Sequence, residues 1–139
     1  MATWLLKTEP EEFSWDDQVK RGAKGEPWTG VRNFTARRHL QDMKKGDLAF
    51  FYHSGEGKEI VGIVRVAKEY YPDHTDETGK FGMVDLEAVK PLKAPVTLKA
   101  IKEDAKLKDF GLVRQGRLSV VAVSDTHWAL LMKMAGEKA

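Results

Sequence analysis

The chain has 139 residues, of which 42% are hydrophobic and 32% are charged, and this balance is typical of one globular domain with its own core. The formal charge of +2 excludes a protein that coats nucleic acid by charge alone, and the lack of cysteine excludes disulfides and thiolate metal sites. The first residues do not have the basic region of a signal peptide, and no apolar run approaches the roughly 20 residues that span a bilayer. We therefore expect a single domain over residues 1–139, located in the cytoplasm, with no membrane partner.

Apolar periodicity and helix-capping residues predict about five strands and four helices. In chain order we expect a strand over 3–7, helices over 14–21 and 33–45, strands over 47–53, 60–68 and 81–89, a helix over 97–108, a strand over 118–123 and a final helix before Gly136. A side chain that can accept a hydrogen bond from the first helical turn stands at each expected helix start, namely Ser14, Asn33, Thr97 and Ser124. Pro91 and Pro95 are expected to bracket a turn.

The mixed order of these elements indicates an α+β domain, because strands and helices do not alternate in a strict βαβ rhythm. Strands that are apolar on both faces favour a small closed or nearly closed barrel with helices at its rim. Gly62, inside the strand over 60–68, is a residue that often marks a bend or a close backbone approach. On the helix over 33–45, Ala36, Leu40 and Met43 form the expected buried stripe.

Metal binding and nucleophilic catalysis find little support in the sequence. The four histidines do not have the spacing of metal ligands, so we expect neither a metal nor a cofactor. The chain has no cysteine and no nucleophile elbow. Ser54 beside His53 is not a natural nucleophile–base pair, because adjacent strand residues point to opposite faces. We expect no catalytic residues.

Two neighbouring stretches, residues 27–38 and 48–54, combine the side chains that a nucleotide base requires. A flipped or single-stranded base needs an aromatic face, polar groups at its edge and cations for the flanking phosphates. Candidate faces are Trp4, Trp15, Trp28, Phe51 and Tyr52; candidate edge contacts are Lys7, Thr8, Asn33, His53 and Ser54; candidate phosphate contacts are Arg32, Arg37, Arg38, Lys44 and Lys45.

Several of these residues also have a structural interpretation. Trp28 is suited to a core or a lid, Arg37 to a solvated helix face or an ion pair with Glu9, and Asn33 to a helix cap. Two other classes of function stay open: a hydrolase or other small-molecule enzyme that uses Glu9, His53 or Asp73, and a protein-interaction domain with a flat apolar patch.

The chain resembles the EVE domain family, a branch of the PUA-like superfamily, in segments spread over nearly its whole length. These segments are Trp4–Pro10, Trp28–Asn33 running into Ala36 and Arg37, Phe50–Ser54, Tyr71–Asp73, Met83–Asp85 and Arg117–Val120. The resemblance implies a PUA-like fold, a small, twisted, mostly antiparallel β-barrel of about five to six strands with helices packed around it. It also implies a non-enzymatic module that reads a modified or flipped-out base, either a modified cytosine in DNA or a modified base in RNA.

What the resemblance implies for the site can be combined with the candidates above. The expected base pocket comprises Lys7, Thr8, Glu9, Trp28, Asn33, Phe51, Tyr52, His53 and Ser54. The expected contacts to phosphates and backbone are Arg32, Arg37 and Lys44. We expect nucleic acid as the partner and a monomeric protein.

Overall fold

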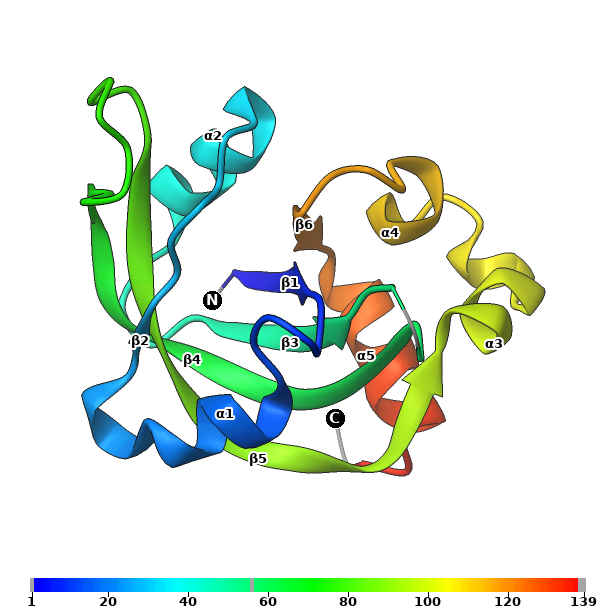
Figure 1. Cartoon of the computed structure of the whole chain (residues 1–139). Helices are drawn as coiled ribbons and strands as arrows, with labels where there is room; N and C mark the ends of the chain where they lie inside the picture. Colours follow the sequence, from blue (N-terminus) through cyan, green and yellow to red (C-terminus); the bar gives the residue numbers. More distant parts are fainter. Residues whose placement is uncertain (1, 56, 138–139) are drawn as a thin grey trace.

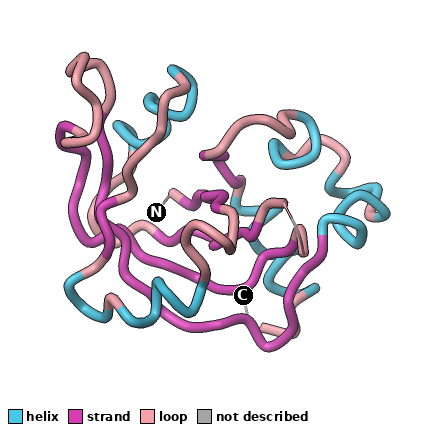
Figure 2. The backbone as a smooth tube through the Cα atoms, viewed as in Figure 1, coloured by secondary structure: helices cyan, strands magenta, loops and turns pink. Residues whose placement is uncertain are grey.

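Six strands pair into one mixed sheet in the order β2-β5-β4-β3-β1-β6 in the computed structural model, which describes residues 2–55 and 57–137 (Figure 1). The strands are β1 (Thr3–Thr8), β2 (Glu26–Pro27), β3 (Leu48–His53), β4 (Glu59–Pro72), β5 (Gly82–Thr97) and β6 (Val120–Val123). The helices are α1 (Trp15–Lys20), α2 (Phe34–Asp42), α3 (Leu98–Glu103), α4 (Gly111–Arg114) and α5 (Asp125–Met134), with short 3-10 turns η1 (Gly22–Lys24) and η2 (Ala105–Leu107). The helices lie around the strands (Figure 2).

The centre of the sheet is a parallel pair, although the remaining pairs are antiparallel. β1 runs beside β3 from Thr3↔Leu48 to Thr8↔His53, because α1, β2 and α2 lie between the two strands in the chain and provide the crossover. Both faces of this pair are buried, as expected. On one face the ring of Phe50 stacks on Trp128 of α5, with centroids 3.9 Å apart.

The expected closed barrel is wrong, since β2 and β6 form the two edges of the sheet. Both edge strands are short: β2 has two residues, one of them Pro27, which has no N–H to donate to a neighbouring strand. β6 has four residues. The sheet curls because β4 and β5 bend, with register shifts that include one between Ile60 and Gly62, but it does not close (Figure 1).

The expected turn between Pro91 and Pro95 is also wrong, because β5 continues through both prolines to Thr97. β2 pairs with β5 only at Leu86 and Asp85, so the rest of β5 has no paired strand on that side in the described chain. Proline is tolerated on such an edge, where its missing N–H would face solvent.

Local helix signals were more reliable than strand ends. The side chains of the four expected caps accept hydrogen bonds from the backbone N–H groups of Asp17, Ala36, Ala100 and His127. Residues 36, 40 and 43 form the expected buried stripe. The helix expected over 97–108 is divided into α3 and η2, and α4 was not expected. No helix in the described residues has both the length and the apolar character needed to cross a membrane.

Candidate nucleic-acid interface

A pocket of about 710 Å³ opens between the two edges of the sheet. One wall comes from the end of β1 and the segment after it, a second from β2 and the residues that follow, and a third from the residues before β6. The lining residues are Lys7, Thr8, Glu9, Glu12, Phe13, Arg21, Glu26, Pro27, Trp28, Thr29, Gly30, Val31, Ser54, Gly116, Arg117 and Ser119. The volume lies in the range of about 300–1,000 Å³ that is usual for small-ligand sites.

The rings of Phe13 and Trp28 form an aromatic corner in this pocket, with centroids 5.9 Å apart and planes that meet at 83°. Phe51 is fully buried and lies 5.7 Å from Trp28 and 6.3 Å from Phe13. Phe51 also packs edge-on against Trp15, at 5.3 Å. The two rings of the corner are therefore supported by the packed core. A flat ligand ring that stacks on one of these rings would lie perpendicular to the other and contact it edge-on.

Close packing beneath this cluster depends on Gly62. A Cβ atom at this position would lie 2.5 Å from the ring of Trp15, so no other residue fits without a shift. The close backbone approach that the sequence indicated at Gly62 is confirmed. The aromatic residues that support the pocket wall therefore have little freedom to move.

Backbone contacts hold the segment that carries Trp28. β2 pairs with β5, and the Trp28 N–H donates to the Val84 carbonyl oxygen at 2.8 Å. Two residues later Gly30 has a φ of 85°, a left-handed conformation that glycine adopts without strain. The Gly30 N–H donates to the carboxylate of Asp73 at 2.9 Å, which fixes the segment a second time.

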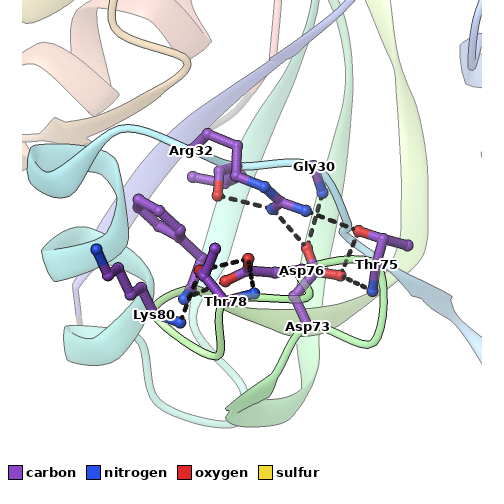
Figure 3. Close-up of polar contacts among 9 residues, drawn as sticks. Gly30, Arg32, Asp73, Thr75, Asp76, Thr78 and Lys80 are labelled. Atoms are coloured by element: carbon purple, nitrogen blue, oxygen red, sulfur yellow. Dashed lines mark hydrogen bonds and ion pairs between the residues drawn. The ribbon is translucent and has the colours of Figure 1, made fainter.

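Asp73 is a buried carboxylate that connects this segment to the loop between β4 and β5 (Figure 3). Besides Gly30, it accepts from Arg32 Nη1 at 3.0 Å and from the hydroxyl and N–H of Thr75 at 2.6 and 2.7 Å. Burial alone would raise the pKa of Asp73, but the hydrogen bonds from Thr75, Gly30 and Arg32 outweigh burial and lower it to about 2. Arg32, expected at a phosphate, is thus engaged in an internal ion pair.

Lys7 supplies a cation to the pocket and fixes part of its rim. Its ammonium group donates to the carbonyl oxygen of Gly116 at 2.8 Å, across from β1 to the segment before β6. Partial burial lowers the pKa of Lys7. An ammonium group has three donors, so two further N–H bonds can serve a ligand.

Hydrogen bonds around Thr8 join the first wall of the pocket to the end of β3. The Thr8 hydroxyl donates to the carbonyl oxygen of Phe13 at 3.0 Å, and the Ser54 N–H donates to the Thr8 carbonyl oxygen at 2.8 Å. These bonds place the hydroxyls of Thr8 and Ser54 on the same side as the aromatic corner. They are groups that can contact the polar edge of a planar ligand.

The positive and negative side chains in the pocket lining are equal in number. The lining contains three cations, Lys7, Arg21 and Arg117, and three carboxylates, Glu9, Glu12 and Glu26. Arg21 and Glu26 form an ion pair at 3.2 Å. Such a pocket favours a neutral ring with a polar edge over a free anion such as phosphate, which needs a surplus of positive charge.

Four residues of the expected base pocket do not line it. Asn33 is exposed and caps α2 by accepting from the Ala36 N–H at 3.0 Å. Phe51 lies in the core behind the aromatic corner, and Tyr52 is buried, which raises the pKa of its hydroxyl. The four residues outside the pocket lining are thus Asn33, Phe51, Tyr52 and His53.

His53 has a structural partner at the start of α1. Its Nε2 accepts from the Trp15 N–H at 3.1 Å, one of the first-turn donors that a helix leaves unpaired. Burial lowers the pKa of His53, although Glu59 and Asp16 oppose the shift, so the neutral ring that can accept this hydrogen bond is favoured.

The other expected phosphate contacts lie outside the pocket lining as well. Arg37 donates to the carbonyl oxygen of Lys80 at 3.0 Å and lies 4.8 Å from the ring of Phe34, so it fastens α2 to the loop before β5. Lys44 is exposed just after α2. Of the expected site residues, the structure brings together Lys7, Thr8, Glu9, Trp28 and Ser54.

Sequence reasoning missed the two residues that complete the pocket most clearly, Phe13 and Arg117. Phe13 directly precedes the helix cap Ser14, a position where an apolar residue is usually explained by packing against the helix. Arg117 stands before the last strand, in a segment that carried the family resemblance but was not assigned a role.

The residues proposed for a hydrolase are not assembled into one site. Glu9 lines the pocket, whereas His53 and Asp73 do not, and each of these two has its own hydrogen-bond partner. In residues 2–55 and 57–137 no three His, Asp or Glu side chains are grouped so that they could hold a metal ion.

Comparison with known proteins finds relatives that match nearly the whole chain. The family model of the EVE domain matches residues 2–134. The chain is 34% identical to thymocyte nuclear protein 1 of Gallus gallus, over 97% of this chain and 69% of that protein. The NMR structure of Rpa0253 from Rhodopseudomonas palustris is 54% identical, with a TM-score of 0.93 over 98% of this chain and 94% of that one.

Two further structures contain nucleic acid. Human THYN1, solved in complex with 5-methylcytosine containing DNA, is 29% identical, with a TM-score of 0.92 and full coverage of both chains, 100% each. The YTH domain of Zygosaccharomyces rouxii MRB1, solved with N6-methyladenosine RNA, shares the fold alone, at 10% identity and a TM-score of 0.56 over 99% of this chain and 88% of that one.

Proposed function

Because the chain belongs to the EVE domain family, we propose that it is a non-enzymatic module that binds a modified, extruded base of a nucleic acid in the pocket between the sheet edges. The observation that carries the proposal is the aromatic corner of Phe13 and Trp28, which stands beside Lys7 in a pocket of balanced charge. A base is a neutral, flat ring with a polar edge, and a base removed from a stack needs a new stacking surface.

Within this proposal each wall of the pocket has a separate role. The aromatic corner stacks the base, and Lys7 donates to a ring carbonyl or nitrogen acceptor. The hydroxyls of Thr8 and Ser54 and the carboxylate of Glu9 contact the remaining polar edge, where a carboxylate can accept from an exocyclic amino group. Arg117 neutralises the phosphate nearest to the pocket mouth.

Three of the expected residues that lie outside the lining, Phe51, His53 and Arg32, act as supports. Phe51 backs the aromatic corner, and His53 fixes the start of α1 next to Trp15. Arg32 holds Asp73, and Asp73 holds the Gly30 turn that follows Trp28. These residues position the pocket wall without touching the base.

The first ligand to test is DNA that contains 5-methylcytosine, since a relative with full-length coverage was solved with such DNA. RNA with a modified base is the second, and the choice between them is a matter for direct competition. Oligonucleotides of one sequence, with cytosine or 5-methylcytosine at a single position, isolate the contribution of the modification.

The experiment is a fluorescence-polarisation titration of these oligonucleotides with the wild type, Trp28→Ala and Arg117→Gln. Loss of a stacking contact weakens binding by about 1–3 kcal/mol, or roughly 5- to 150-fold. Trp28 is only 7% exposed, so circular dichroism must show that Trp28→Ala is folded. Arg117→Gln removes an exposed lining residue, and Arg114→Gln is its matched control because Arg114 lies outside the lining.

Equal affinity of the wild type for modified and unmodified oligonucleotides would contradict the proposal. So would unchanged binding by both folded pocket variants. Chemical turnover of a ligand by the wild type, lost in a folded His53→Ala variant, would instead favour the hydrolase.

A further inference from the structure

A second groove lies at the start of β4, beyond the segment that connects β3 to β4. Its volume is about 620 Å³, and it is lined by Gly57, Lys58, Thr97, Leu98, Lys99, Lys102 and Glu103. We call it the lysine groove. The groove is formed by the start of β4, the end of β5 and α3, and the Leu98 N–H donates to the Lys58 carbonyl oxygen at 2.8 Å across it.

The charge of the lysine groove differs from that of the base pocket. Three of its seven lining residues are lysines and one is a glutamate. The lysines are exposed, and none of the three forms an ion pair within the described part of the chain. The groove therefore has a surplus of positive charge that the base pocket does not have, and phosphates are attracted by such a surplus.

The near rims of the two sites lie close together in the chain and in space. Ser54 lines the base pocket and Gly57 lines the lysine groove, and they are three residues apart in the chain. Three consecutive Cα–Cα steps of 3.80 Å span at most about 11 Å. Since stacked nucleotides in one strand rise by about 3.4 Å each, the span between these two rim residues corresponds to roughly three nucleotides.

We infer that the lysine groove binds phosphates of the strand whose base enters the pocket. The inference rests on the proposed function, and it transfers the role expected for Arg32, Arg37 and Lys44 to Lys58, Lys99 and Lys102. Arg32 and Arg37 have protein partners on their guanidinium groups, whereas the three lysines face solvent. The apolar side chain of Leu98 also lines the groove, where a sugar of the strand can pack against it.

The test is the salt dependence of binding in the double variant Lys99→Gln/Lys102→Gln. The matched control is Lys93→Gln/Lys133→Gln, which removes the same charge at two exposed lysines that line neither site. Each lost phosphate contact reduces the slope of log Kd against log salt by about 1, so the groove variant should lose about 2 and the control should keep the wild-type slope. The ratio of affinities for modified and unmodified oligonucleotides should stay the same in the groove variant.

The outcomes separate this inference from the function on which it rests. A wild type that discriminates between the bases, together with a groove variant of unchanged slope, would overturn the lysine groove alone. A wild type that binds without discrimination would overturn the base pocket, and a reduced slope in the groove variant would then still support a phosphate-binding groove. A wild type that binds neither oligonucleotide would overturn both.

Discussion

Replacement of Asp73 by asparagine should destabilise the wall of the base pocket through a single buried charge. The side chain of Asp73 is fully buried, and four donors from Gly30, Arg32 and Thr75 converge on it. Its pKa falls from 3.8 to about 2, and at about 1.4 kcal/mol for each pH unit this shift contributes about 2 kcal/mol to the free energy of unfolding. Asp73→Asn should lose this contribution at pH 7.

The pH dependence gives the sign of this effect. A carboxyl group with a depressed pKa stabilises the fold above its unfolded pKa, and the contribution is lost as the pH falls towards the folded pKa. Urea unfolding of the wild type and Asp73→Asn should therefore differ by about 2 kcal/mol at pH 7 and by about half as much at pH 3.

Asp109→Asn is the matched control for this experiment. Asp109 also pairs with an arginine, Arg114, at 2.9 Å, but the two side chains are 68% and 65% exposed. Exposed pairs contribute about 0–1 kcal/mol, so this variant should unfold close to the wild type. A loss in Asp73→Asn that is no larger than in Asp109→Asn, or that does not shrink between pH 7 and pH 3, would refute the reasoning.

Two further predictions concern the support of the aromatic corner. Gly62→Ala should lower the free energy of unfolding by about 1–3 kcal/mol in urea titrations, because its Cβ would meet the ring of Trp15 at 2.5 Å. Gly116→Ala is the control, since a Cβ at that position meets open space. Equal stability of the two variants would contradict the packing argument. His53→Gln should reduce the loss of stability between pH 7.5 and pH 5.5, measured by the same titrations, because a histidine with a lowered pKa stabilises the fold above its unfolded pKa of about 6.5 and loses that contribution as pH falls. The glutamine oxygen can still accept from Trp15 but does not titrate, so an unchanged pH dependence would count against this role.

The features of the fold that could be predicted from sequence have local causes. Ser14 and Asn33 cap helices through contacts three residues away, and Gly62 indicated a close approach from its position in an apolar strand. In contrast, closure of the sheet and the path of β5 through Pro91 depend on which strands pair with one another in the folded protein. A short edge strand such as β2 has no local signal that reveals whether it will pair on its second side.

The residues of the candidate site show the same division between local causes and tertiary contacts. Lys7, Thr8 and Ser54 stand at the ends of neighbouring strands β1 and β3, and the family resemblance implied that they share a pocket. Phe13 and Arg117 come from irregular segments, and their position in the pocket depends on tertiary contacts that no periodicity encodes.

The alternation of side chains along a strand was not enough to predict the roles of the β3 residues. Phe51 and His53 share a face, and that face is covered by α1, so both became supports instead of pocket contacts. The sequence showed that the two side chains alternate with Tyr52, but it did not show which element covers them.

The most direct test of the central claim is an NMR measurement of intermolecular contacts to the methyl protons of a 5-methylcytosine in a bound oligonucleotide. If the base enters the pocket between the sheet edges, these protons should show nuclear Overhauser effects to the pocket-lining residues Trp28, Phe13 and Thr8, and the base should no longer stack on its neighbours. Overhauser effects only to residues outside the pocket, or a methylated base that stays stacked and paired in the complex, would contradict the account.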